Sequence, residues 1–221
     1  MVGAIIMAHG DEQGLRLPPK IAPTQVVVVP IYRTDEEKET VMQYLLAACE
    51  PLLSVGIRLH IDKREGLTPG YKFHDWEMRG VPVRMEIGPR DVENQKAVLV
   101  RRDVADKKER KAIVERANLI PEVSRLLNEI QRNMLKQATE FRDANTHPAE
   151  TYDAMKEIVQ DGWALMYHCG TAECEDKIKE DTKASSRNFP LAENPEWNPK
   201  DKKCLVCGKP AEGKAIFARA Y

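Results

Sequence analysis

Four consecutive valines, Val26 to Val29, constrain the fold of this chain more than any other stretch. A run of β-branched residues without polar alternation is typical of a strand that is buried on both faces. The next stretch predicts a helix, because Thr34 can cap its start and Glu37 completes a capping box. Alternation of apolar and polar residues resumes over residues 58–62. The order strand, helix, strand predicts a β-α-β unit and therefore a sheet with helices packed on it. The apolar stripe of the predicted helix is formed by Val41, Tyr44, Leu45, Ala48 and Leu52.

The segment 68–91 predicts a further helix and strand. Thr68 and Pro69 form a helix start, and Gly80 is a left-handed helix end. The alternation over residues 82–87 predicts a strand with one buried face, on which Arg84 and Glu86 point to the polar side. If Glu77, Arg84 and Arg90 share one surface, they form either a plain salt-bridge cluster or a group that recognises guanine edges.

Helical patterns dominate the second half of the chain. After a strand over residues 96–102, the apolar spacing predicts a long helix from Pro121 to about Asn145. A shorter helix over residues 149–161 and a strand over residues 163–168 follow. The stripe of the long helix indicates packing rather than a ligand site, and it consists of Val123, Leu126, Leu127, Ile130, Met134, Leu135, Ala138 and Phe141.

The apolar run at residues 4–8 predicts a buried strand, and its abrupt start is typical of a segment cut from something larger. This run lacks the cationic leader and cleavage site of a signal peptide, and no stretch suits a membrane helix. We therefore expect a cytoplasmic location, where thiols stay reduced. The net charge of −1 excludes a surface that binds polyanions by its overall field, so any nucleic acid binding has to be local.

Four of the five cysteines form two pairs. Cys169 and Cys174 are separated by four residues, and Cys204 and Cys207 by two, with 29 residues between the pairs. Two such thiolate pairs predict a closed, structural zinc site, although two local disulfides remain an alternative. His168 is a further candidate ligand, but four thiolates already suffice. Cys49 is predicted to be a core residue.

The chain ends on an apolar and aromatic stretch, with Tyr221 as its last residue. Chain ends are normally polar and loose, so this end is expected to dock. It docks either for structural reasons or to place its carboxylate in a site.

These features together resemble the prolyl-tRNA synthetase family. The resemblance is carried by residues 3–23 (GAIIMAHGDEQGLRLPPKIAP), by the segment 68–91, by the two cysteine pairs and by the final FARAY. The chain is most similar to the archaeal and eukaryotic-type form, which has an additional C-terminal zinc domain. The resemblance implies an α/β fold with a mixed sheet flanked by helices, followed by a small α+β zinc-binding domain.

The resemblance also implies an activity for the parent protein. Members are class II synthetases that form prolyl-adenylate from proline and ATP with Mg²⁺, and then transfer proline to tRNA, with a homodimer as the full-length assembly. This chain starts beyond the motifs that hold ATP and proline, so it is expected not to activate proline alone. His9 and Asp11 match an HGD sequence near the substrate pocket of the family.

Site residues are implied by position. Glu77 matches a carboxylate that accepts from a guanine of the UGG anticodon, and Arg84 matches an arginine that donates to one. Arg90 stands where some members have lysine, and a further lysine aligns with Lys107 or Lys108. The zinc ligands of the family match Cys169, Cys174, Cys204 and Cys207, and its terminal tyrosine carboxylate, here that of Tyr221, folds back toward the active site.

The implied domain boundaries are a remnant of the catalytic core and linker over residues 1–22, an anticodon-binding domain over 23–120, a connecting helix over 121–145 and a zinc-binding domain over 146–221. A free-standing, non-catalytic tRNA-binding protein of the same fold remains an alternative. A domain for a small nucleotide is disfavoured, because no glycine-rich loop follows the valine strand. We expect no membrane or DNA partner.

Overall fold

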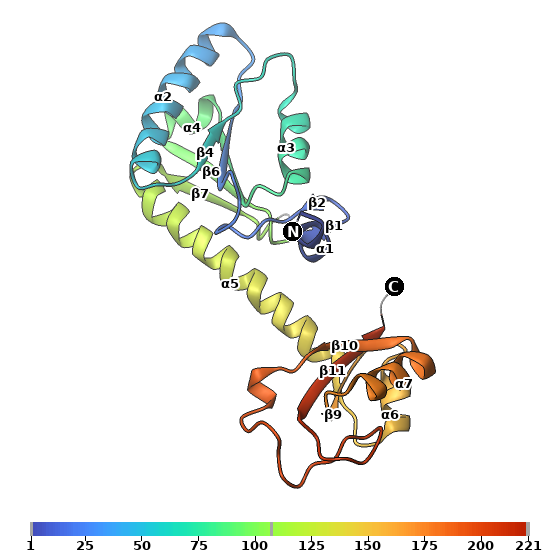
Figure 1. The fold of residues 1–221 in the computed structure, drawn as a ribbon. Coiled ribbons are helices and arrows are strands. Elements are labelled where there is room, and N and C mark those ends of the chain that lie inside the picture. The colour runs from blue at the N-terminus through green and yellow to red at the C-terminus, as the bar shows by residue number, and fades with distance from the viewer. Residues whose placement is uncertain (1, 107, 220–221) are drawn as a thin grey trace. The chain divides into compact units, whose positions relative to one another are not determined.

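The computed structural model describes residues 2–106 and 108–219 (Figure 1). The chain divides into two compact units, of which the first ends at Lys136 and the second begins at Gln137. This division falls within the long helix α5 (Leu119–Asn145). The predictions made for Lys107 and Tyr221 lie outside the described residues.

A five-stranded mixed sheet forms the centre of the first unit, as expected. Its strand order is β4-β3-β5-β6-β7, in which β3 is parallel to β4 and β5, while β6 is antiparallel to both β5 and β7. The strands are β3 (Val26–Pro30), β4 (Leu59–Ile61), β5 (Val83–Ile87), β6 (Lys96–Arg101) and β7 (Lys111–Glu115).

Helices cover both faces of this sheet. Val26 and Val28 pack with α2 (Asp35–Ser54) and the first part of α5, whereas Val27 and Val29 pack with Trp76 of α3 (Pro69–Met78). The prediction that the valine strand is buried on both faces is therefore confirmed. The short helix α4 (Pro89–Glu93) connects β5 to β6, and the 3-10 turn η1 (Arg116–Asn118) leads from β7 into α5.

The predicted start of α2 is confirmed in part. The Thr34 hydroxyl accepts a hydrogen bond from the Glu37 backbone at 3.2 Å. The Glu37 carboxylate accepts from the backbone N–H of Arg33 at 2.7 Å, one residue before the position that a capping box requires.

The expectation of a polar face on β5 is wrong. Arg84 and Glu86 are only 6% and 7% exposed, and all five residues of the strand are buried. Alternation revealed which residues point to opposite faces of the strand, but not that α3 covers the second face.

The expected strand at residues 4–8 is also wrong. These residues belong to helix α1 (Val2–His9), which has no buried residue and is followed by a short hairpin of β1 (Gly10–Asp11) and β2 (Gly14–Leu15). No strand of the described residues pairs with this segment, so a helix satisfies its backbone groups locally. The hairpin lies against the end of α3, where a Cβ at Gly14 would come within 2.5 Å of the Met78 backbone.

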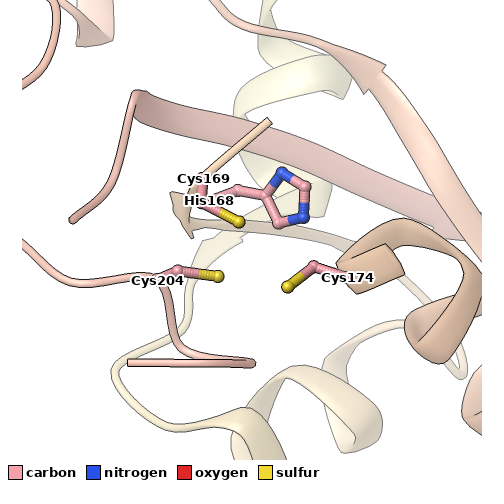
Figure 2. A group of neighbouring side chains, drawn as sticks. All are labelled: His168, Cys169, Cys174 and Cys204. Atoms are coloured by element: carbon pink, nitrogen blue, oxygen red, sulfur yellow. The ribbon is translucent and has the colours of Figure 1, made fainter. Parts of the chain in front are cut away.

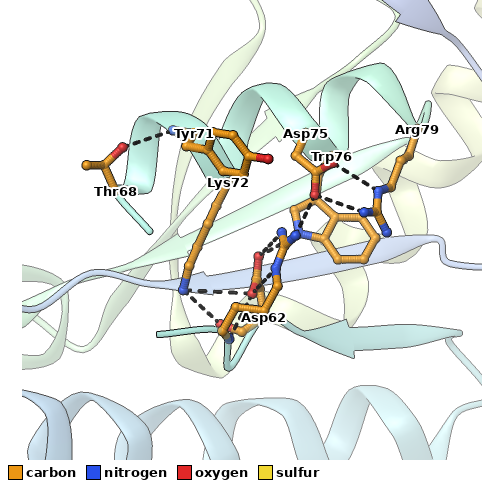
Figure 3. Close-up of polar contacts among 8 residues, drawn as sticks. Asp62, Thr68, Tyr71, Lys72, Asp75, Trp76 and Arg79 are labelled. Atoms are coloured by element: carbon orange, nitrogen blue, oxygen red, sulfur yellow. Dashed lines mark hydrogen bonds and ion pairs between the residues drawn. The ribbon is translucent and has the colours of Figure 1, made fainter. Parts of the chain in front are cut away.

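A buried carboxylate fixes α3 to the sheet (Figure 3). Asp62, directly after β4, is fully buried and accepts a hydrogen bond from Trp76 Nε1 at 2.8 Å. Arg64 donates to both of its oxygens, at 3.0 and 2.7 Å, and also pairs with Asp75 at 2.8 Å. Lys72, itself 4% exposed, donates to the Asp62 carbonyl at 3.3 Å. Through Lys72, Asp75 and Trp76, these contacts connect α3 to the end of β4.

The second unit contains a four-stranded sheet in the order β10-β11-β9-β8. The helix predicted over residues 149–161 is shorter in the structure, because α6 begins after the Thr151 cap and ends before Val159. The helix α7 was not predicted. The elements of this unit are β8 (Thr146–Pro148), α6 (Tyr152–Ile158), β9 (Trp163–His168), α7 (Ala172–Thr182), β10 (Ala184–Asn188), η2 (Leu191–Glu193) and β11 (Gly213–Arg219).

The predicted stripe of α5 is buried only in its first half. Residues up to Met134 belong to the core of the first unit, as predicted. Leu135 and Phe141 are instead 68% and 62% exposed, so the prediction that they belong to a buried stripe is wrong. Phe141 nevertheless contacts the Trp163 ring edge-on, with centroids 6.0 Å apart. The apolar residues keep their helical spacing after Met134, but that part of α5 no longer packs on the core of the first unit. None of the helices in the described residues combines the length and apolar character that crossing a membrane demands.

The contacts of Asp62 predict a large cost for its neutralisation. Asp62→Asn leaves the buried Lys72 ammonium without its carboxylate, so the free energy of unfolding of the chain should fall by about 3 to 5 kcal/mol. Urea unfolding followed by Trp fluorescence measures this. The matched control is Glu65→Gln, which removes an exposed ion pair with Lys38 and should change stability far less, because solvent screens such pairs. Equal effects of the two variants would contradict the role given to Asp62.

The same carboxylate predicts a pH dependence. Burial acts to raise the pKa of Asp62, but the hydrogen bonds from Arg64 and Trp76 and the charge of Lys72 outweigh it and hold the pKa well below its usual range. A lowered pKa stabilises the fold above the unfolded value of about 3.9, and this contribution is lost as the pH falls further. The stability difference between wild type and Asp62→Asn should therefore shrink below about pH 4.

Candidate functional site

Glu77 and Arg84 form a partly buried ion pair between α3 and β5. Arg84 Nη1 lies 2.6 Å from Glu77 Oε1. The same guanidinium donates to Glu86 Oε1 from Nε at 3.0 Å, and its Nη2 lies 2.9 Å from that oxygen. Its carbon lies 4.1 Å from the centre of the Phe73 ring. Arg84 thus holds two carboxylates in place beneath α3.

The Glu77 carboxylate is held by a second cation and stays accessible. Arg110 Nη1 lies 3.4 Å from the same Oε1, and Arg102 Nε donates to the Glu77 backbone carbonyl at 3.2 Å. The Glu77 side chain is 20% exposed, against 7% for Arg84. The result is an oriented carboxylate acceptor that is partly exposed to solvent.

Asp11 of the HGD sequence joins this cluster. Arg102 donates to both Asp11 oxygens, at 2.6 and 3.0 Å, and Arg16 lies 3.4 Å away. Burial acts to raise the pKa of Asp11, but the hydrogen bond from Arg102 outweighs it and lowers the pKa. Arg102 therefore ties the β1–β2 hairpin to the end of α3. Burial also lowers the pKa of His9, whose backbone carbonyl accepts from Arg16 at 2.7 Å.

Sequence reasoning missed Arg102 and Arg110. Both flank the connection between β6 and β7, and Arg102 follows the strand that pairs antiparallel with β5. The only signal in the sequence was a cation at each end of that connection. The strand register that brings them to Glu77 cannot be derived from residue order.

The remaining predicted residues, Arg90 and Lys108, have no described contact with the Glu77–Arg84 pair. Arg90 is exposed on α4, beyond the opposite end of β5, and its carbonyl accepts from Asn94 at 2.7 Å. No described contact links Arg90 to Glu77 or Arg84. Lys108 is exposed in the connection that ends at Arg110, and its backbone N–H donates to Asp106 at 2.7 Å.

In the second unit, a histidine and three cysteines converge from three segments (Figure 2). His168 ends β9, Cys169 follows it, Cys174 lies on α7, and Cys204 lies in the loop before β11. One ligand atom from each lies within 4.8 Å of the others. The Cys207 sulfur lies 3.8 Å from that of Cys169 but is exposed. All five cysteines are free thiols, so the disulfide alternative has no support in this structure.

Two glycines shape the loops that carry these sulfurs. Gly208 has φ +71° and its N–H donates to the Cys204 carbonyl at 2.9 Å, which turns the chain directly after the second pair. Gly170 also has φ +71°, and a Cβ there would meet the Glu212 carboxylate at 2.0 Å. Because both residues have a positive φ, glycine is strongly favoured in the loops that carry the two cysteine pairs.

The thiols differ in their ease of ionisation. Burial acts to raise the pKa of Cys169, but hydrogen bonds from Thr171 and neighbouring thiols lower it to about 7. Burial raises the pKa of Cys174 to about 12 and also raises that of Cys204. Adjacent thiols that ionise together need a cation to balance them, and soft sulfur ligands suit zinc. The donor set therefore fits a zinc ion.

Cys49 is separate from this cluster. It is 1% exposed within α2, which confirms the prediction that it is a core residue, and burial raises its pKa to about 12. A hollow of about 640 Å³ between α2 and the start of α5 is also separate, since none of the predicted site residues lines it.

The comparisons with known proteins match both units. The family described as "Anticodon binding domain" matches residues 25–126, and the family described as "Prolyl-tRNA synthetase, C-terminal" matches residues 152–221. A proline–tRNA ligase of Rubrobacter xylanophilus is 46% identical over 222 residues, and one of Roseiflexus castenholzii is 42% identical over 224 residues. Each alignment covers 100% of this chain, but only 44% and 45% of the relative.

The Glu77–Arg84–Glu86 arrangement predicts that lysine cannot replace Arg84. Lysine offers a single nitrogen and cannot bond both carboxylates in the geometry of a guanidinium. Arg84→Lys should lower the free energy of unfolding by about 2 kcal/mol, measured by urea unfolding. Arg79→Lys, at an arginine whose side chain is 54% exposed, is the control and should cost less than about 0.5 kcal/mol. A harmless Arg84→Lys would show that the buried cluster contributes little.

Proposed function

Since this chain belongs to the prolyl-tRNA synthetase family and contains its anticodon-binding and C-terminal domains, we propose that it recognises the anticodon of tRNA for a proline–tRNA ligase. The chain spans about 45% of the length of the curated relatives it matches. The ligase reaction, with ATP, Mg²⁺ and proline as its substrates and cofactors, is accordingly proposed for the whole protein. This chain alone is proposed not to activate proline.

The observation that carries the proposal is the oriented, part-exposed carboxylate of Glu77. Single-stranded RNA bases are recognised by hydrogen bonds at their edges, and guanine presents N–H donors on its Watson–Crick edge. A carboxylate accepts such donors in a charge-assisted bond. Because Arg84 and Arg110 hold Glu77 in advance, less side-chain freedom is lost when the base binds.

Arg84 serves this recognition in two proposed ways. Its first role is to orient Glu77 through the 2.6 Å contact. Its second role, implied by the family resemblance, is to donate to a guanine through guanidinium hydrogens that do not bond Glu77 and Glu86. A guanidinium has five N–H donors, so both roles are compatible with one side chain.

The exposed cations supply the rest of the proposed interface. Arg90 and Lys108 are exposed, and Lys107 is the alternative to Lys108. We propose that they contact the RNA backbone or a base beside the guanines, since cations position an RNA without selecting its sequence. The UGG anticodon, the homodimer of the full-length enzyme and a cytoplasmic location remain parts of this proposal that rest on the family resemblance.

For the second unit we propose a structural zinc ion held by Cys169, Cys174, Cys204 and Cys207. The convergence of three of these sulfurs and the 3.8 Å approach of the fourth support this set. A site closed by four thiolates has no open position for a substrate, so its contribution is to hold the loops around β9, α7 and β11 together. The carboxylate of Tyr221 keeps its proposed role toward the active site of the whole protein.

Anticodon recognition is tested with a stem-loop RNA that carries UGG. Glu77→Gln replaces an acceptor oxygen by a donor, so the dissociation constant should rise about 5- to 150-fold, corresponding to 1–3 kcal/mol. Fluorescence anisotropy with labelled RNA at constant salt measures this. A loop in which inosine replaces a guanine lacks the 2-amino group, so the wild-type chain should bind it more weakly than the UGG loop. The loss of affinity on this replacement should be smaller for Glu77→Gln.

The control for this experiment is Glu39→Gln, an identical charge change at an exposed residue of α2. It corrects for the change in net charge and should leave RNA binding within about twofold, because a distant exposed charge is screened. If Glu77→Gln and Glu39→Gln bind the UGG loop equally well, Glu77 does not contact a guanine.

The zinc proposal predicts one metal ion per chain. Cys204→Ser should lower the bound zinc from about one equivalent to nearly none, and it should destabilise the second unit because the loops lose their common ligand. Metal analysis after dialysis and limited proteolysis measure the two effects. Cys49→Ala should keep the metal, since Cys49 lies in the core of the first unit. A wild-type chain that holds no zinc would refute the site.

A further inference from the structure

His168 carries the feature of the second unit that the proposed function leaves unexplained. The residue is 2% exposed, and its Nε2 is a buried polar atom without a hydrogen-bond partner among the described residues. An unpartnered buried donor or acceptor costs about 1 to 3 kcal/mol. A histidine at such a position is expected to gain a hydrogen-bond partner when the neighbouring metal site is occupied.

The other ring nitrogen determines where the proton lies. The backbone N–H of Gly170 donates to His168 Nδ1 at 3.1 Å. A nitrogen that accepts a hydrogen bond carries no proton, so the ring is neutral and its single proton lies on Nε2. The unpartnered atom is therefore an N–H donor.

This tautomer argues against His168 as a metal ligand through Nε2. A neutral histidine binds a metal with its unprotonated nitrogen, while its other N–H donates to a neighbour. Here the unprotonated nitrogen is already occupied by Gly170, and the nitrogen that remains carries the proton. His168 would have to lose the Gly170 contact or its last proton to become a ligand.

The surroundings offer cysteine sulfurs as acceptors for this N–H. Phe217 and Phe189 lie against the ring, with centroids 5.1 and 6.5 Å away, and offer no hydrogen-bond acceptor of ordinary strength. Ser186 donates to Glu175 Oε1 from both N and Oγ. The Glu175 and Glu212 carboxylates act on His168 through their charge, but neither has a described hydrogen bond to Nε2. One ring nitrogen of His168 lies within 4.8 Å of three cysteine sulfurs (Figure 2).

We propose that His168 is a positioning residue of the metal centre, and that its Nε2–H donates to a cysteine thiolate when the metal is bound. This inference rests on the metal site proposed above. Four thiolates and one Zn²⁺ carry a net charge of −2, which is costly to bury. An N–H that points at sulfur offsets part of this charge, and hydrogen bonds to ligand atoms of this kind fix the ligands and adjust the metal affinity.

Two substitutions separate the two ring nitrogens. His168→Asn keeps an oxygen near the position of Nδ1, so Gly170 retains its acceptor, but it has no donor near the position of Nε2. His168→Gln places an amide N–H near the position of Nε2. Zinc affinity of the full chain by chelator competition should fall about 10- to 100-fold in His168→Asn and recover in part in His168→Gln.

Cobalt(II) substitution gives a readout that a packing role would not change. Loss of an N–H donor makes a thiolate a stronger electron donor, so the sulfur-to-cobalt charge-transfer bands should move to longer wavelength in His168→Asn. Their intensity should stay that of four thiolates, and Cys207→Ser should lower it. His168→Gln should restore part of the wild-type band position.

Three results would overturn the proposal. Unchanged zinc affinity and unchanged band positions in His168→Asn would show that the ring only packs against Phe217. Retention of the full cobalt spectrum in Cys207→Ser, together with its loss in His168→Asn, would make His168 the fourth ligand. A wild-type chain that binds neither metal refutes the metal site itself, whereas anticodon binding is measured separately and is not affected by any of these results.

Discussion

The burial of Asp62 is the constraint on which the geometry of the first unit depends. A carboxylate without exposed surface is tolerated only when hydrogen bonds and cations compensate it, and Trp76, Arg64 and Lys72 do so here. Trp76 and Lys72 both belong to α3, so their bonds to the end of β4 position the whole helix. Because α3 is held there, Glu77 on its last turn lies over Arg84 of β5.

Around Glu77, arginines likewise compensate carboxylates and connect neighbouring elements. Arg84 connects Glu77 with Glu86, and Arg102 connects the end of α3 with Asp11 of the β1–β2 hairpin. Each cation bonds two elements, so the acceptor that we assign to guanine recognition is part of the packing of the sheet. Under this proposal, recognition of RNA and stability of the fold share residues, and Glu77 differs from Arg84 in its greater exposure.

In the second unit, the groups that need compensation on burial are thiols rather than carboxylates. Its core is small, and thiols from three segments meet beside it. Buried thiols resist ionisation, as the raised pKa values of Cys174 and Cys204 show, and a bound cation would reverse this preference. In the proposal made above, the neutral His168 ring donates its Nε2–H to one of these sulfurs, while the Gly170 backbone N–H occupies its Nδ1.

The sequence alone determined the periodic features, because local patterns report local structure. The valine strand, the Thr34 and Thr68 caps, a sheet with helices packed on it and the spacing of the cysteine pairs were all visible in residue order. The mixed character of the sheet was implied only by the family resemblance. Tertiary structure decided which faces are covered. It buried Arg84 under α3, left Leu135 and Phe141 exposed, and folded residues 2–9 as a helix. Strand register, which brings Arg102 and Arg110 to Glu77, and the tautomer of His168 depend on contacts between segments far apart in the chain, and no local pattern encodes them.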